Sequence, residues 1–133
     1  MLTLADLEDL AEEEVKEHLI VDYCAEPYGQ KERLKVKSEL DNLEILVAYE
    51  SVGNFGCDSS SFFLFKHKQT RQLYELHGSH CSCYGFEGQF DLDETTLKYL
   101  QSRAFCFCAG GYDYQEEVNK RLVREFLRDY DIT

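Results

Sequence analysis

Two short segments of this chain concentrate side chains that can bind metals or act as nucleophiles. The first is His77-Gly78-Ser79-His80-Cys81-Ser82-Cys83, with two histidines and two cysteines, and the second is Cys106-Phe107-Cys108. Together they use four of the six cysteines and two of the four histidines. This concentration is compatible with a metal site, a thiol-based active site, or a core in which cysteine packs as a small apolar residue.

Zinc is the metal that such a set would suit, because thiolate sulfur and imidazole nitrogen are its usual ligands. The candidate ligands are His77, His80, Cys81, Cys83, Cys106 and Cys108. The common zinc signature uses Cys-x-x-Cys pairs, whereas both pairs here are Cys-x-Cys. In an extended strand, residues i and i+2 share a face, so both sulfurs of a pair could still point the same way. A small zinc-binding module that uses residues 77–108 is therefore an alternative interpretation.

Burial in a reduced core is the preferred explanation for the cysteines. Free cysteine is among the most frequently buried residue types. In residues 104–108, strand alternation would place the two phenylalanines on one face and Ala104, Cys106 and Cys108 on the other. This pattern predicts a short strand with large residues against one layer and small residues against another.

A thiol-dependent enzyme is the least favoured of the three classes. A nucleophilic cysteine needs a base within hydrogen-bond reach. In an extended chain His80 points away from Cys81 and Cys83, so it is badly placed to deprotonate either thiol. We therefore assign no catalytic residue and no metal ligand, expect no cofactor, and predict a protein that is not an enzyme.

Length, composition and charge limit the remaining classes. The 133 residues, 44% of them apolar, fit one folded domain. The net charge of −12 opposes binding to nucleic-acid backbones and to anionic membranes, and favours basic partner surfaces. Neither a secretory signal nor a long apolar span is visible, so we expect a cytoplasmic protein with reduced cysteines.

The apolar pattern predicts a single α+β domain over residues 1–133, with a mainly antiparallel sheet packed against two or three helices. An acidic amphipathic helix is expected within residues 1–20, specifically over 3–19, because Leu4, Leu7, Ala11, Val15 and Leu19 form one stripe. Residues 44–108 form the predicted sheet-forming core. It has strands at 44–50, 61–67, 72–77 and 104–108, and a short helix at 93–102 capped by Asp91 or Asp93.

The flanking segments are predicted from similar patterns. Residues 31–37 mix charges with apolar residues and suggest an amphipathic strand. A helix is expected over 113–130, where Asp113 and Glu116 form a capping-box pair. Its predicted buried stripe is Val118, Leu122, Phe126 and Tyr130, widened by Val123 and Leu127.

The N-terminal segment carries the candidate binding residues. Its carboxylates are Asp6, Glu8, Asp9, Glu12, Glu13 and Glu17, and Lys16 is the only cation in residues 1–20. On one continuous helix these carboxylates would form rows in which like charges repel by a few tenths of a kcal/mol per pair. A solvated helix face explains this pattern, and so does an anionic ridge that faces a basic protein surface and acts as a DNA mimic.

Residues 77–89, His-Gly-Ser-His-Cys-Ser-Cys-Tyr-Gly-Phe-Glu-Gly-Gln, lie within a stretch from Tyr74 to Phe90 that continues through Glu94-Thr95-Thr96. This stretch resembles a segment of small uncharacterised proteins encoded by bacteriophages and prophages. The resemblance implies an accessory phage protein in the host cytoplasm. Such a protein would bind and inhibit a host defence or nucleic-acid-binding protein. The resemblance implies no activity or catalytic residue.

Overall fold

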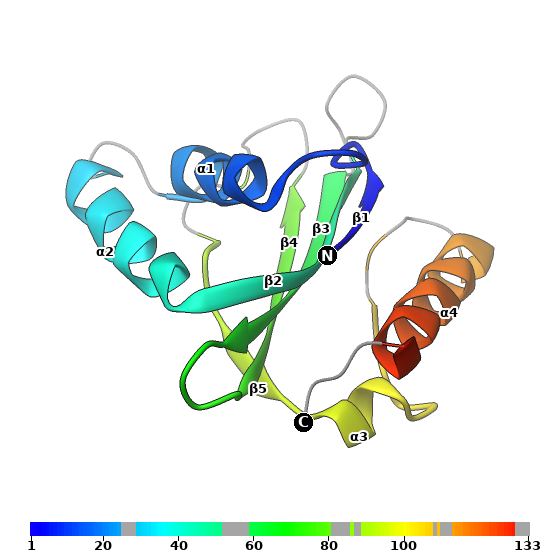
Figure 1. Ribbon diagram of the computed structural model, residues 1–133. Helices are drawn as coiled ribbons and strands as arrows, with labels where there is room; N and C mark the ends of the chain where they lie inside the picture. Colours follow the sequence, from blue (N-terminus) through cyan, green and yellow to red (C-terminus); the bar gives the residue numbers. More distant parts are fainter. Residues whose placement is uncertain are drawn as a thin grey trace.

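The computed structural model of the chain is a single α+β domain, in which one sheet lies between two layers of helices (Figure 1). The structure describes residues 1–24, 29–51, 59–80, 86, 89–107, 109 and 113–129, without the side chains of residues 30, 80 and 113–115. The mainly antiparallel sheet expected from the apolar pattern is confirmed.

The five strands of the sheet follow one another in space in the same order as in the sequence. They are β1 (Leu2–Ala5), β2 (Leu43–Ser51), β3 (Ser59–His67), β4 (Leu73–His80) and β5 (Asp93–Thr95). All neighbouring strands pair antiparallel except β1 and β2, which are parallel. The strand β1 therefore forms one edge of the sheet.

Four helices cover the two faces of the sheet. They are α1 (Glu12–Asp22), α2 (Gly29–Asp41), α3 (Leu97–Leu100) and α4 (Asp113–Asp129). Buried residues of α1 and α2 belong to the core on one face, and those of α3 and α4 belong to the core on the other (Figure 1). We call these the α1/α2 face and the α4 face.

The central strand β3 shows why both faces are buried. Phe63 and Phe65 point into the core of the α1/α2 face, whereas Phe62 and Leu64 point into the core of the α4 face. All four side chains are fully buried. A continuous apolar run is typical of a strand that is covered on both sides. The predicted hairpin of 61–67 and 72–77 is accordingly confirmed as β3 and β4, each somewhat longer than expected.

The prediction of a helix over 3–19 is wrong in its first half. Residues 2–5 form β1, which pairs with β2 from Leu2 opposite Val47 to Ala5 opposite Glu50. Positive φ angles at Ala5 (56°) and Asp9 (70°) mark the turn that follows. Helix α1 begins only at Glu12, where the side chain of Glu14 accepts a hydrogen bond from the backbone N–H of Ala11. Pairing with a distant strand thus overrides the local helical spacing.

Three further element predictions need correction. Residues 31–37 lie within helix α2, whose Val36 and Leu40 are buried, so they are not a strand. The segment 93–102 divides into strand β5 and helix α3, and Thr96, not Asp91 or Asp93, caps that helix by accepting from the N–H of Tyr99. Residues 104–107 form no strand, although Phe105 and Phe107 are buried as their alternation implied.

The C-terminal helix is present as predicted, but its buried face is rotated. Val123 and Leu127 are buried together with Asn119 and Lys120. Leu122 and Phe126, which were expected at the centre of the buried stripe, are only partly buried, as is Val118. Tyr130 lies outside the described residues. The helix therefore leaves two large apolar side chains partly exposed along one side.

A search for membrane spans through the described part of the chain finds no helix of sufficient length and hydrophobicity.

Candidate functional site

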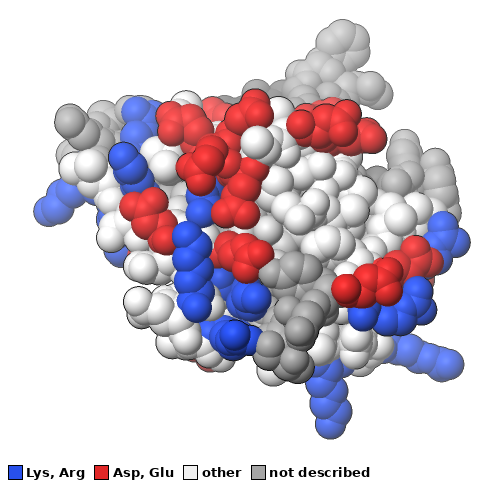
Figure 2. Space-filling view, in the orientation of Figure 1, with Lys and Arg blue, Asp and Glu red and all other residues white. Residues whose placement is uncertain are grey.

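The six carboxylates proposed for partner binding remain at the surface, on two elements instead of one helix. Asp6, Glu8 and Asp9 lie in the turn after β1 and are exposed. Glu13 and Glu17 are exposed on α1, and Glu12, the first residue of that helix, is partly exposed. We call this set the acidic surface; Figure 2 shows carboxylates gathered over the region of α1.

Lys16, the one lysine or arginine among residues 1–20, does not place its charge among the exposed carboxylates. Lys16 is buried, and its Nζ lies 3.1 Å from Oε1 of Glu12. On the adjoining helix α2, Lys31, Lys35 and Lys37 are exposed. The acidic surface therefore includes carboxylates of the β1 turn and of α1, and α2 beside it carries exposed lysines.

The later start of α1 changes the energetic argument for these carboxylates. Glu12, Glu13 and Glu14 occupy its first turn, where the helix dipole stabilises negative charge by about 0.3–1 kcal/mol each. Their repulsion is thus offset in part by their position in the helix. Glu17 lies beyond the first turn, and the turn carboxylates precede the helix, so this explanation does not extend to them.

A buried polar network holds the acidic helix on the sheet. The ring of His18 on α1 lies between two carboxylates: Nδ1 is 2.6 Å from Oδ2 of Asp22, and Nε2 is 2.9 Å from both oxygens of Glu50 on β2. Glu50 is 5% exposed. Because carboxylates only accept, both ring nitrogens can donate only in the imidazolium form. Hydrogen bonding to Glu50 raises the pKa of His18 above its usual 6.5, although burial acts in the opposite direction.

Tyr23 extends the network into the core. Its hydroxyl donates to Oε1 of Glu50 over 2.7 Å and lies 2.8 Å from Oγ of Ser61 on β3. Because the single O–H of Tyr23 donates to Glu50, the hydroxyl of Ser61 is the donor in the second hydrogen bond. Burial raises the pKa of Tyr23 well above its usual range, with the Glu50 charge as the next cause. The phenol therefore stays neutral, and the network carries one cation facing two carboxylates.

Phe86 and Gly78 pack closely against Tyr23 and Ser61 of this network. The ring of Phe86 stacks on that of Tyr23, with centroids 4.7 Å apart and planes within 3°. Beneath them Gly78 on β4 is buried, and a Cβ at that position would collide with Oγ of Ser61 and lie 2.9 Å from Cδ1 of Phe86. Ser61 has no exposed surface, so it is not accessible to a substrate. The network therefore positions α1 and offers no nucleophile.

The sequence analysis did not find this network. The three contacts that His18 and Tyr23 make with Glu50 and Ser61 join residues 27 to 38 positions apart in the sequence. One signal was present: Glu50 ends the apolar run of 45–49, and a carboxylate at the end of a buried strand requires a partner.

The cysteine–histidine cluster is only partly visible. His77 lies on β4, where its Nε2 is 3.0 Å from Oε1 of Glu75 and its ring meets Phe62 edge-on. Cys81, Cys83, Cys108 and the side chain of His80 lie outside the described residues, so the zinc interpretation stays an untested prediction. Within the described part, no group of three or more His, Cys, Asp or Glu side chains could hold a metal ion.

Two cysteines can be examined directly. Cys24 is a free, buried thiol whose pKa is raised chiefly by burial, so it behaves as a small apolar residue. Cys106 is exposed and disulfide-bonded. The expectation of a buried, reduced cysteine therefore holds for Cys24 and is wrong for Cys106.

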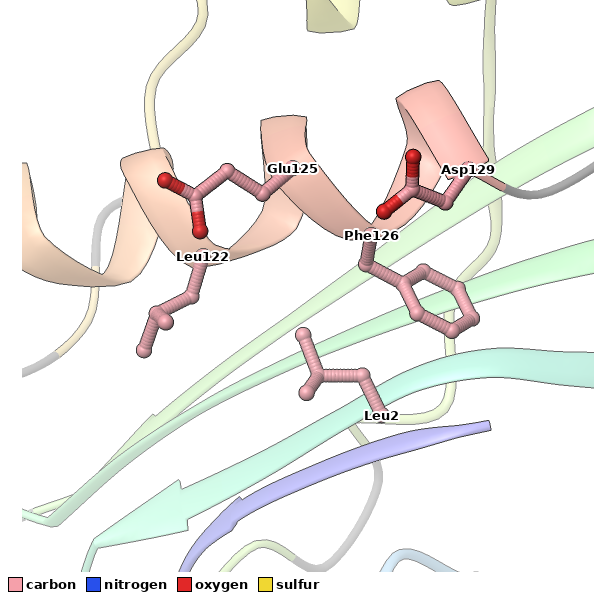
Figure 3. A pocket seen from close by; sticks show the side chains of 5 residues that line it. All are labelled: Leu2, Leu122, Glu125, Phe126 and Asp129. Carbon is pink, nitrogen blue, oxygen red and sulfur yellow. The ribbon is translucent and has the colours of Figure 1, made fainter.

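An apolar groove lies between β1 and α4. Leu2 projects from the edge strand toward Leu122 and Phe126 of α4, and Glu125 and Asp129 lie along its rim (Figure 3). Its volume is about 340 Å³. The groove was missed in the sequence because Leu122 and Phe126 were assigned to the buried stripe of α4.

Comparison with protein families, characterised proteins and solved structures finds no match to this chain. The fold and the arrangement of the described residues define an α+β domain with an acidic surface and an apolar groove.

Proposed function

We propose that this chain is a small binding protein that uses the acidic surface to occupy a basic site on a protein partner. The observation that carries the proposal is the concentration of carboxylates on the β1 turn and α1. Six carboxylates lie there, and Lys16, the one lysine or arginine of residues 1–20, is buried against Glu12. A surface of one sign steers a partner of the opposite sign and suppresses wrong partners.

The buried network supports the proposal because it holds α1 in a fixed position on the sheet. His18 and Tyr23 fix α1 to β2 and β3 through Glu50 and Ser61, so the carboxylates of α1 are presented by a helix held at a defined position. A preorganised surface loses less conformational entropy on binding than a flexible acidic tail does. The geometry thus favours recognition of a folded basic surface.

The class of partner follows from the charge and from the resemblance to phage and prophage proteins. A basic site that normally binds nucleic acid presents lysine and arginine side chains to phosphates. An acidic protein could occupy such a site as a DNA mimic. We propose a host nucleic-acid-binding or defence protein as the partner, in the cytoplasm of the host cell.

The test is capture from a bacterial lysate on immobilised protein, with washes of rising salt and elution by duplex DNA. The variant E8K/E13K/E17K reverses three exposed carboxylates and leaves Asp9, whose positive φ disfavours lysine. The matched control D91K/D93K/E94K makes the same change in charge at exposed positions in and beside β5. We expect the first variant to lose DNA-elutable partners and the control to keep them. Equal capture by both variants would refute the proposal.

A further inference from the structure

Helix α4 carries exposed acidic and basic residues on two adjoining sides. Leu122, Glu125, Phe126 and Asp129 are spaced by three or four residues and share the side that faces the groove. Arg121, Arg124 and Arg128 share an adjoining side, where Arg124 donates to the backbone oxygen of Ser102. Arg121 and Arg128 lie four and three residues from Glu125, so they are its neighbours along the helix. Figure 2 shows acidic and basic side chains next to one another in the region of α4.

The two rim carboxylates are available to a partner. Glu125 and Asp129 are exposed, and among the described residues neither forms an ion pair. They are four residues apart on one helix, so their charges repel slightly. Arg121 and Arg128 offset part of this repulsion at Glu125, and a partner's cation between the two carboxylates would offset more of it.

The floor of the groove is apolar and partly exposed. Leu2, Leu122 and Phe126 each keep part of their surface accessible and meet across a space of about 340 Å³ (Figure 3). This volume exceeds what one large aliphatic side chain needs. Burying a leucine there would contribute about 1.5–3 kcal/mol, or roughly 10- to 100-fold in affinity.

The groove opens at the edge of the sheet. The strand β1 is the terminal strand, and within the described part of the chain no other strand pairs with its outer side. An extended segment can add to such an edge through main-chain hydrogen bonds and place alternate side chains on one face. On the α4 face those side chains would lie beside Leu2, in the groove.

We propose that this groove binds an extended segment of a partner protein that carries one large apolar side chain flanked by lysine or arginine. The apolar side chain fills the space between Leu2, Leu122 and Phe126, and the flanking cations pair with Glu125 and Asp129. A second copy of this chain is a poorer occupant, because a symmetric contact would bring the same carboxylates together. The inference rests on the proposed function only in taking the partner to be basic.

The experiment uses three fluorescein-labelled pentapeptides with the whole protein. The first is Lys-Arg-Leu-Arg-Lys, the second replaces its leucine with serine, and the third replaces its four cations with glutamate. Binding is followed by fluorescence anisotropy and by methyl NMR shifts of Leu2 and Leu122. We expect the first peptide to bind, the serine peptide to bind at least about tenfold more weakly, and the glutamate peptide not to bind.

Three variants locate the site. L122S removes part of the apolar floor, and E125K/D129K reverses the rim at two exposed positions. The control E117K/E94K makes the same change in charge on the arginine side of α4 and on β5. We expect the first two variants to weaken binding of the leucine peptide by about tenfold or more. The control should retain binding within the twofold change expected of a remote charge.

Other results would overturn the inference. If the leucine and serine peptides bind equally and E8K/E13K/E17K removes that binding, the cations bind the acidic surface alone, and the proposed function survives without the groove. If no peptide binds, the groove is not such a site. If L122S abolishes self-association measured by analytical ultracentrifugation, the groove is an interface between copies of this chain.

Discussion

The two faces of the sheet hold their helices by different means. On the α1/α2 face, directional bonds from His18 and Tyr23 to Glu50 and Ser61 join helix α1 to two strands within an apolar core. On the α4 face, Phe62 packs against Phe105 and Phe107 with centroids 5.7 and 4.6 Å away. Directional bonds specify one position for a helix, whereas ring packing fills space and leaves the outer side of α4 partly uncovered.

The two histidines bonded to buried carboxylates show the same difference. His18 connects α1 with β2, because Asp22 lies on its own helix and Glu50 lies on the sheet. His77 bonds to Glu75 two residues away on the same strand. The first pair joins two elements that are distant in the sequence, and the second only orients a side chain. We therefore expect substitutions on the two faces to have different consequences.

The largest effect is expected from the adjacent phenylalanines of β3. F62A and F63A each remove a fully buried ring, one from each face, and each should lower the free energy of unfolding by about 3–5 kcal/mol. Urea denaturation gives the magnitude. Methyl NMR shows the location: F62A should shift Val123 and Leu127, and F63A should shift Val15 and Leu19. A loss below about 1 kcal/mol for F62A would contradict the role given to ring packing.

The next effect concerns the histidines. H18A removes two charge-assisted contacts and leaves Glu50 buried, so we expect a loss of about 1.5–3 kcal/mol. H77A serves as the matched substitution on the other face and should cost less, because its bond to Glu75 lies within one strand and its link to β3 is a ring contact with Phe62. Chemical denaturation at pH 6 measures both. Equal losses would remove the distinction between the two faces.

A smaller effect is expected at Gly78, where the added Cβ of G78A would collide with Oγ of Ser61 and the ring of Phe86. Overpacking of this kind costs about 1–3 kcal/mol. The neighbouring substitution S79A changes an exposed side chain on the same strand and should be nearly neutral. Thermal denaturation compares the two variants. An unchanged Tm for G78A would contradict the close packing of Phe86 and Ser61 against Gly78.

The smallest effect is expected from pH alone. Because the pKa of His18 is raised in the folded protein, its stabilising contribution is complete below its unfolded pKa near 6.5. That contribution is lost as the pH rises through the folded pKa. The neutral ring keeps its packing and one donor, so the change is smaller than that of H18A. Urea titrations from pH 5 to 9 should show the wild type approaching H18A, and parallel curves would contradict the assignment.

The sequence allowed prediction of elements whose signals are local. The apolar run 62–65 identified the central strand, and the spacing of residues 118–127 identified helix α4. The N-terminal strand was missed because its partner begins some forty residues later, and the spacing of Leu4, Leu7 and Ala11 imitates a helix. Periodicity alone cannot distinguish such a coincidence from a real helical stripe.

The candidate site divides in the same way. The carboxylates of the acidic surface could be named from the sequence because exposure is the usual state of charged residues. The groove could not, since the orientation of Leu122 and Phe126 depends on which strands α4 packs against. The buried network required contacts among α1, β2 and β3 that only the folded chain brings together.

The parallel pairing of β1 also has a consequence for the order of folding. The strands β2, β3 and β4 are joined by short connections, whereas β1 must close a loop of some forty residues before it pairs. We expect β1 to dock after the hairpins form and to detach first during native-state opening. Because Leu2 lines the groove and Asp6 to Asp9 follow the same strand, detachment would disrupt the groove and displace the part of the acidic surface that lies in the β1 turn. A partner bound there would stabilise β1, the last strand to dock, and would therefore slow amide exchange along it.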